Sequence, residues 1–215
     1  MIPPPSHYLA PLVEELHKQW PLNRTVNLVC HGHSVPAGYF ATPFVDTFNA
    51  YPHLLHVLLK ERFPFAVVNV LVTAKGGESS DAGASRFEAE VLRLPPDLVT
   101  IDYALNDRGI GLYSAEKAHR AMIEAALERE AKVLLLSPSP DLRARGDENE
   151  TRKLAAFGAQ ARSLAGEYGV GFEDVSAHFA AREAEIGELM SWSNHPNRAG
   201  HELIARALLR WFPVA

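Results

Sequence analysis

Five short apolar runs rich in β-branched residues alternate along the chain with longer stretches of mixed polarity. The runs cover residues 25–30, 66–72, 98–103, 132–136 and 170–175. The stretches between them place apolar residues at helical spacing, as at Leu54, Leu55, Leu58 and Leu59. Strands that alternate with helices are typical of a parallel sheet covered on both faces. The pattern therefore predicts an α/β fold with five parallel strands.

Four of the intervening stretches predict long helices, and two of these begin at a polar residue that can cap a helix. Asn49 is expected to cap the first and Ser114 the second. The other two helices are expected over residues 150–168 and 198–212. A short helix near residues 8–16 should pack outside the sheet.

Length and composition are those of an ordinary soluble globular protein. The chain has 215 residues, of which 47% are hydrophobic and 22% charged. We expect one domain over residues 1–215, and composition excludes disorder, collagen and a coiled coil. No stretch approaches the roughly 18–20 apolar residues of a membrane helix, and the beginning of the chain lacks the features of a signal peptide. We therefore expect a cytoplasmic protein.

Net charge limits the possible binding partners, and cysteine content limits the possible disulfide bonds. The 21 basic and 26 acidic residues give a formal net charge of −5, which offers no electrostatic footprint for nucleic acid or an anionic membrane. The only cysteine, Cys30, excludes an intramolecular disulfide. It lies in an apolar run, where a buried and unreactive thiol is expected.

Polar motifs follow the first three predicted strands, and a fourth lies near the C-terminus. In order they are Gly32-His33-Ser34, Gly76-Gly77-Glu78, Asn106-Asp107 and Ser193-Asn194-His195. Ligands of open parallel sheets bind at the carboxyl ends of the strands, so these side chains are expected to meet. A serine, a glycine turn, an asparagine and a late histidine can supply a nucleophile, oxyanion donors and a general base.

Together, these four motifs resemble the blocks of the SGNH hydrolases, the esterase and lipase superfamily also called GDSL. Ser34 matches the nucleophile, Gly77 the glycine block, Asn106 the asparagine block and His195 the last block. The resemblance covers nearly the whole chain. It implies a three-layer α/β/α sandwich with a five-stranded parallel sheet of flavodoxin-like order, and no metal or organic cofactor.

The resemblance also implies a mechanism. Ser34 would attack an ester carbonyl while His195 accepts its proton, and the backbone N–H groups of Ser34 and Gly77 with the Asn106 amide would bind the oxyanion. Glu78 and Asp107 are expected to point away or to orient a neighbour, because a negative charge would oppose the forming oxyanion.

Two positions depart from the family pattern. His33 replaces the usual Asp before the serine, and Trp192 replaces the usual Asp three residues before the histidine. The imidazole therefore needs another partner on Nδ1. We expect a main-chain carbonyl from residues 191–194, such as that of Trp192 or Ser193. The alternative is a carboxylate from elsewhere, with Asp174 and Asp141 as candidates.

Each candidate residue also has a purely structural interpretation. Ser34 can be a helix N-cap, Gly77 can supply a positive φ in a turn, and Asn106 can cap a turn. His195 can be a structural hydrogen-bonding residue. His31 and His33 form a His-x-His pair that can suggest a metal site. The positions where a binuclear motif would place its next ligands hold Val and Pro, so no metal is expected.

The sequence thus predicts a serine esterase that acts on a small-molecule ester with a short acyl group, such as acetyl on a sugar or small alcohol. A lysophospholipase or acyl thioesterase is the enzymatic alternative. A binding module that keeps the fold but has lost catalysis is the alternative from another class. The oligomeric state stays open.

Overall fold

The computed structural model describes residues 1–214 and is built around a parallel sheet of five strands. The strands are β1 (Thr25–Gly32), β2 (Val67–Val72), β3 (Leu98–Asp102), β4 (Lys132–Leu136) and β5 (Gly171–Glu173). They lie in the order β2-β1-β3-β4-β5, and all neighbouring pairs are parallel. The predicted α/β class and flavodoxin-like strand order are confirmed.

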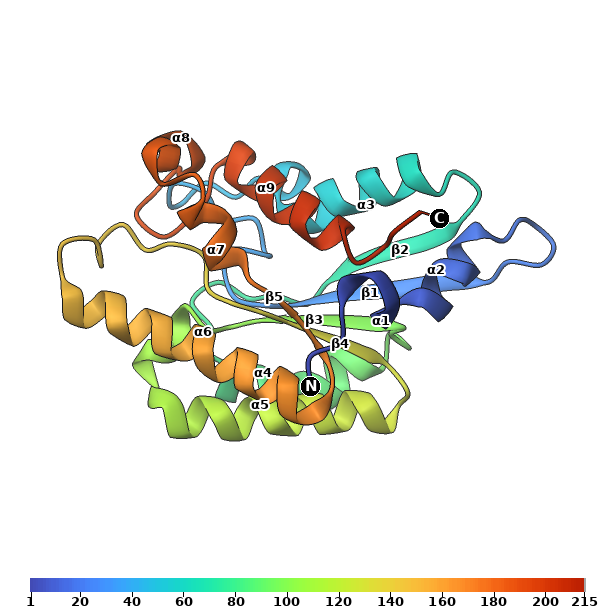
Figure 1. Cartoon of the computed structure of the whole chain (residues 1–215), viewed down its shortest axis with the longest axis horizontal. Helices are drawn as coiled ribbons and strands as arrows, with labels where there is room; N and C mark the ends of the chain where they lie inside the picture. Colours follow the sequence, from blue (N-terminus) through green and yellow to red (C-terminus); the bar gives the residue numbers. More distant parts are fainter. Residues whose placement is uncertain (215) are drawn as a thin grey trace.

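Helices cover both faces of this sheet. They are α1 (Pro5–Tyr8), α2 (Ala10–His17), α3 (Tyr51–Arg62), α4 (Ser80–Phe87), α5 (Gly111–Glu128), α6 (Glu148–Tyr168), α7 (Val175–Ala180), α8 (Ile186–Leu189) and α9 (Arg198–Leu209). Shorter turns of helix are η1 (Thr47–Asn49), η2 (Glu88–Leu92), η3 (Asn106–Gly109) and η4 (Glu183–Glu185). Figure 1 shows α3 and α9 on one face and α4, α5 and α6 on the other. None of these helices within residues 1–214 is long and apolar enough to cross a membrane.

The two faces of the sheet bury separate apolar clusters. Successive strand residues point to opposite faces, so Leu134 contributes to the cluster under α3 and α9 while Leu135 contributes to that under α5 and α6. Both side chains are essentially inaccessible to solvent, which stabilises the fold by about 1.5–3 kcal/mol for each residue of this kind. Burial on both faces explains why the strands appear in the sequence as continuous apolar runs.

The structure corrects two predicted helix starts. Helix α3 has Ala50 rather than Asn49 at its N-cap. Pro52 has no N–H and is tolerated only in a first turn, so the helix begins just before it. Helix α5 begins at Gly111, three residues before Ser114. The φ of +79° at Gly111 lets the chain turn directly from η3 into α5 without a capping side chain.

Real side-chain caps start the last two long helices. Asp147 accepts hydrogen bonds from Asn149 N and Glu150 N, so α6 begins two residues earlier than predicted. Asn197 Oδ1 accepts from Gly200 N at 3.1 Å and starts α9 at the predicted place. This second cap matters for the site, because α9 follows immediately after the loop that carries the late histidine.

Candidate active site

Ser34 lies in the turn that follows β1, next to the end of β3. His33 N donates to Asp102 O at 3.2 Å, which extends the pairing of the two strands up to the serine. A Cβ atom at Gly32 would lie 2.5 Å from Asp102 O and 2.8 Å from a Pro36 carbon. Glycine is therefore required there for the turn to approach β3 so closely.

His195 meets Ser34 from the loop between α8 and α9. Its Nε2 lies 2.9 Å from Ser34 Oγ, and both side chains are buried. Its Nδ1 lies 2.7 Å from the main-chain oxygen of Phe40. A carbonyl can only accept, so the ring hydrogen is on Nδ1 and Nε2 is free to accept from the serine hydroxyl. The structure thus brings these two predicted residues together in the tautomer that a general base needs.

The partner of His195 Nδ1 is a correction to the sequence analysis. The group is a main-chain carbonyl, but it comes from Phe40 and not from residues 191–194. The N–H groups of Ser191 and Trp192 are instead turned toward the carbonyl of His195 itself. The Ser193 carbonyl accepts from Leu142 N at 2.6 Å.

Neither candidate carboxylate reaches the imidazole. Asp174 caps α7 through Ala177 N and accepts from Ser137 Oγ at 3.0 Å. Asp141 forms an ion pair with Arg108 at 2.6 Å. Both carboxylates are therefore occupied in structural contacts away from His195.

One turn carries both Ser34 and the carbonyl that accepts from His195. Tyr39 N donates to Ser34 O at 3.0 Å, and Phe40 N donates to Phe44 O at 3.0 Å. Gly38, with a φ of +86°, reverses the chain between Ser34 and Phe40. The Phe40 carbonyl is thereby fixed with respect to Ser34, independently of the loop that carries His195.

Three hydrogen-bond donors line the cavity beside Ser34 and His195. In the part of the chain that the structure describes, Ser34 N and Gly77 N donate to no protein acceptor. Gly77 has a φ of +76°, which confirms its expected place in a glycine turn. Asn106 Nδ2 donates one hydrogen to Glu78 O at 2.9 Å, which orients the amide and leaves its second hydrogen available. Ser34, Gly77 and Asn106 line one cavity of about 400 Å³ together with His195.

The nearby carboxylates point away from these donors, as expected. Glu78 pairs with Arg86 and accepts from Tyr103 Oη at 2.7 Å. Burial raises the pKa of Glu78, but these two partners outweigh it and lower the pKa overall. Asp107 is buried and accepts from Ser80 N at 2.8 Å. Neither residue lines the cavity at Ser34.

A sequence model described as the GDSL-like Lipase/Acylhydrolase family matches residues 30–203, which include every residue of this site. The chain belongs to this family. It is therefore a carboxylic ester hydrolase, and its recognition as an SGNH (GDSL) hydrolase from four short motifs is confirmed.

Solved structures share the fold of this GDSL hydrolase. Axe2, an acetylxylan esterase from Geobacillus stearothermophilus, superposes with a TM-score of 0.77 at 21% identity, over 88% of this chain and 95% of that chain. LAE5, an alpha/beta hydrolase enzyme from the metagenome of Lake Arreo, Spain, has a TM-score of 0.75 at 23% identity, over 87% and 94% of the two chains. A comparison with curated protein sequences finds no match.

In this GDSL hydrolase the pKa of His195 is lowered from its ordinary value. Burial is the main cause, the Phe40 carbonyl opposes it by stabilising the ring hydrogen, and the neighbouring His33 lowers the pKa further. Within residues 1–214, no carboxylate counteracts the effect of burial on the pKa of His195. The imidazole is therefore held in its neutral form, which is the form that accepts a proton.

The two histidines of the His-x-His pair have separate surroundings. His31 lies against Thr73 Oγ1 at 2.9 Å and Tyr103 Oη at 3.1 Å, away from the cavity. His33 packs against Ser34 and faces Asp102. Among residues 1–214, no group of three or more His, Cys, Asp or Glu side chains is placed to hold a metal ion. Cys30 is buried in the apolar core, and burial raises the pKa of its thiol to about 12.

Three cavity residues were not identified from the sequence. Tyr39, Thr42 and Arg143 line the space above Ser34. Tyr39 and Thr42 belong to the turn after Ser34, whose path depends on a glycine and a strand-like bridge between Tyr39 and Val45. Arg143 lies in the polar loop after β4, where nothing in the local sequence indicates which way it folds.

Proposed function

We propose that this ester hydrolase removes a short acyl group, such as acetyl, from a sugar or other small alcohol, with Ser34 as nucleophile and His195 as general base. The observation that carries the proposal is the 2.9 Å contact between Ser34 Oγ and His195 Nε2, with the opposite ring nitrogen bonded to a carbonyl. This arrangement gives the serine a base of defined tautomer.

The first half of the reaction forms an acyl-enzyme. Ser34 Oγ attacks the ester carbonyl carbon as its proton passes to His195 Nε2. The carbonyl π electrons move to oxygen, where the N–H groups of Ser34 and Gly77 and the Asn106 amide donate to the new charge. One such donor typically contributes roughly 2.7–4 kcal/mol to transition-state stabilisation. The C–O bond to the alcohol then breaks, and His195 protonates the leaving oxygen.

The second half repeats the same steps with water. His195 removes a proton from water, whose oxygen attacks the acyl carbon, and the proton returns to Ser34 Oγ as the acid leaves. In both halves the Phe40 carbonyl holds the imidazolium through its Nδ1 hydrogen. A carbonyl dipole stabilises that cation less than a full negative charge would, so we expect a modest turnover.

The lining of the cavity supports a small and polar substrate. Within residues 1–214, no aliphatic side chain lines the cavity at Ser34. Besides Ser34, Gly77, Asn106 and His195, the lining includes Tyr39, Thr42, Asn194, Arg143 and Trp192. Trp192 is 47% exposed and lines this cavity, so its indole offers a flat apolar surface of the kind on which a sugar ring can lie. The solved relative Axe2 is an acetylxylan esterase, which agrees with this substrate class.

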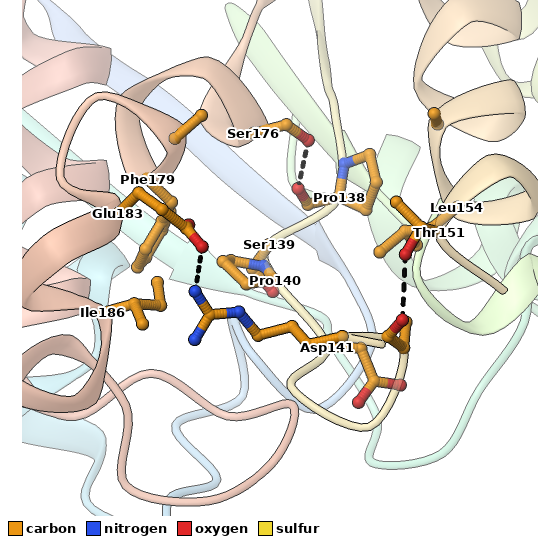
Figure 2. A pocket seen from close by; sticks show the side chains of 14 residues that line it. Pro138, Ser139, Pro140, Asp141, Thr151, Leu154, Ser176, Phe179, Glu183 and Ile186 are labelled. Carbon is orange, nitrogen blue, oxygen red and sulfur yellow. Dashed lines mark hydrogen bonds and ion pairs between the residues drawn. The ribbon is translucent and has the colours of Figure 1, made fainter. Parts of the chain in front are cut away.

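A long acyl chain has no obvious place beside Ser34. A second cavity of about 300 Å³ is mainly apolar and is lined by residues such as Pro138, Leu154, Phe179 and Ile186. Figure 2 shows it between the segment after β4 and the α7 region. Arg145 and Glu183, which form an ion pair, are both among its lining residues. This cavity shares no lining residue with the one at Ser34. It therefore offers no support for a lysophospholipase or long-chain thioesterase.

The test is a substrate panel applied to the wild type and to Ser34→Ala. The panel consists of p-nitrophenyl esters from acetate to palmitate together with acetylated sugars. We expect the wild type to hydrolyse acetate best and Ser34→Ala to retain its fold, by circular dichroism, without turnover. Undiminished hydrolysis by Ser34→Ala would contradict the nucleophile, and a preference for palmitate would contradict the substrate class.

A further inference from the structure

His33 is a buried histidine beside the nucleophile for which the reaction just described has no use. Its side chain is inaccessible to solvent, and its Nδ1 lies 3.3 Å from Ser34 Oγ. The same Nδ1 accepts a hydrogen bond from Val35 N at 3.3 Å. Ser34 Oγ therefore lies between two imidazole rings, that of His195 at 2.9 Å and that of His33.

The contact with Val35 shows which tautomer of His33 is present in the structure. Because the Val35 N–H points at Nδ1, that nitrogen carries the lone pair and the ring hydrogen is on Nε2. Nε2 makes no hydrogen bond of ordinary geometry within residues 1–214, and Asp102 Oδ1 lies 3.4 Å from it. Asp102 is the carboxylate placed to favour this tautomer.

Asp102 reaches this position through the sheet itself. It is the last residue of β3, it lies in register with Gly32 of β1, and its side chain is buried. Besides His33, the polar group that faces it is the Tyr51 hydroxyl, which donates to Oδ2 at 3.4 Å. Burying a carboxylate with so few hydrogen bonds destabilises the folded state unless a neighbouring group donates to it. His33 Nε2 is the donor that faces Asp102 Oδ1.

The pair also accounts for the departure of this chain from its family. Most members have Asp before the serine, where this chain has His33. With Asp102 opposite, an Asp at position 33 would place two buried carboxylates side by side, which is strongly unfavourable. The histidine and Asp102 are thus mutually dependent.

We propose that His33 and Asp102 form a positioning pair for Ser34. The proposal rests on Ser34 being the nucleophile. Asp102 holds the hydrogen of His33 on Nε2, so Nδ1 accepts from Val35 N–H and fixes the turn that presents Ser34 N–H to the oxyanion. In the other tautomer an Nδ1 hydrogen would point at Ser34 Oγ, engage a lone pair needed for attack and oppose Val35 N–H. The pair therefore keeps Oγ free for attack while His195 takes its proton.

The test compares Asp102→Asn, His33→Asp and the double variant His33→Asp/Asp102→Asn. An amide at position 102 no longer selects one His33 tautomer, so we expect kcat to fall about tenfold with little change in KM. His33→Asp alone should lower kcat about a hundredfold, because two carboxylates then repel beside the nucleophile. The double variant should recover at least about tenfold of that loss. Its carboxylate at position 33 can accept from Val35 N–H in an Asx turn and from the amide introduced at position 102.

Thr100→Val is the matched control. Thr100 lies on the same strand, is buried, and its hydroxyl makes no hydrogen bond of ordinary geometry within residues 1–214. This variant should keep the wild-type kcat, which separates a general disturbance of β3 from the loss of the pair. Thermal unfolding of each variant shows whether it is folded. If His33→Asp is unfolded, the kcat of Asp102→Asn tests the proposal by itself.

Wild-type kcat in Asp102→Asn would overturn the proposal. A folded double variant that is no more active than a folded His33→Asp variant would also overturn the proposal. It would show that replacing the second carboxylate restores no activity. Neither outcome would contradict the proposal that Ser34 is the nucleophile. Failure of the proposed function looks different: the wild type and Thr100→Val would both leave every ester of the panel unhydrolysed.

Discussion

The imidazole of His195 lies between the Ser34 hydroxyl and the Phe40 carbonyl. The first contact could be predicted from the sequence, and the second could not. Ser34, His195 and Asn106 are residue types with chemical signatures, and their motifs were sufficient to predict that they would meet. The Phe40 carbonyl belongs to the main chain, which every residue type has, and it lies 155 positions from His195. No sequence pattern could have indicated it.

Asn106 provides a prediction at this scale. Its amide is oriented by Glu78 O, and the free hydrogen would bind charge that develops only in the transition state. Asn106→Ala should therefore lower kcat by about a hundredfold or more with a smaller change in KM. Asn106→Asp is the isosteric control and should be at least as inactive, because it adds a negative charge. A rise in KM alone, measured by steady-state kinetics, would assign Asn106 to substrate binding instead.

At the scale of elements, the strands were predictable and several helix starts were not. Residues 133–136 of β4 are all apolar because both faces of the sheet are covered there, so the sequence alone identifies them as a buried strand. The start of α5 depends on a glycine with positive φ, and α4 carries no apolar stripe in its sequence Ser-Asp-Ala-Gly-Ala-Ser-Arg-Phe. Packing against α5 and β1 determines that helix more than its own pattern does.

Two helix caps yield a prediction about elements. Asp174 caps α7 away from the imidazole, whereas Asn197 caps α9 directly after His195. Each change to Ala should lower the free energy of unfolding by about 1 kcal/mol. Asp174→Ala should keep the wild-type kcat, and Asn197→Ala should lower it because the His195 loop loses its anchor. Urea unfolding and ester hydrolysis measure both effects. A large loss of kcat in Asp174→Ala would instead show that a carboxylate serves His195.

At the scale of the whole molecule, burial of histidines couples folding to pH. Burial lowers the pKa of His31 to about 4 and that of His201 to about 3, with Arg86 and His195 as smaller causes. Below the ordinary histidine pKa of about 6.5, the unfolded chain takes up protons that the folded chain does not. Stability should therefore fall as the pH drops from about 6.5 toward 4, by about 1.4 kcal/mol per pH unit for each of these histidines.

His201→Asn isolates one of the two contributions. His201 Nδ1 accepts from Tyr51 N at 3.2 Å, and an Asn oxygen can accept in its place without titrating. Urea unfolding at about pH 7, 6 and 5 should give a shallower decline for this variant than for the wild type, whatever its stability at pH 7. An unchanged slope would show that His201 titrates in the folded protein near its ordinary pKa.

The central claim is that Ser34 is activated by a neutral His195 whose partner is a carbonyl and not a carboxylate. The most direct measurement is the rate and site of labelling by a fluorophosphonate, read by peptide mass spectrometry from about pH 5 to about pH 8. We predict that the label is on Ser34, that His195→Ala slows it strongly, and that the rate is half-maximal below the ordinary histidine pKa of about 6.5, because burial and His33 lower the pKa of His195. A label on another residue, or a half-maximal rate well above that pH, would contradict the account.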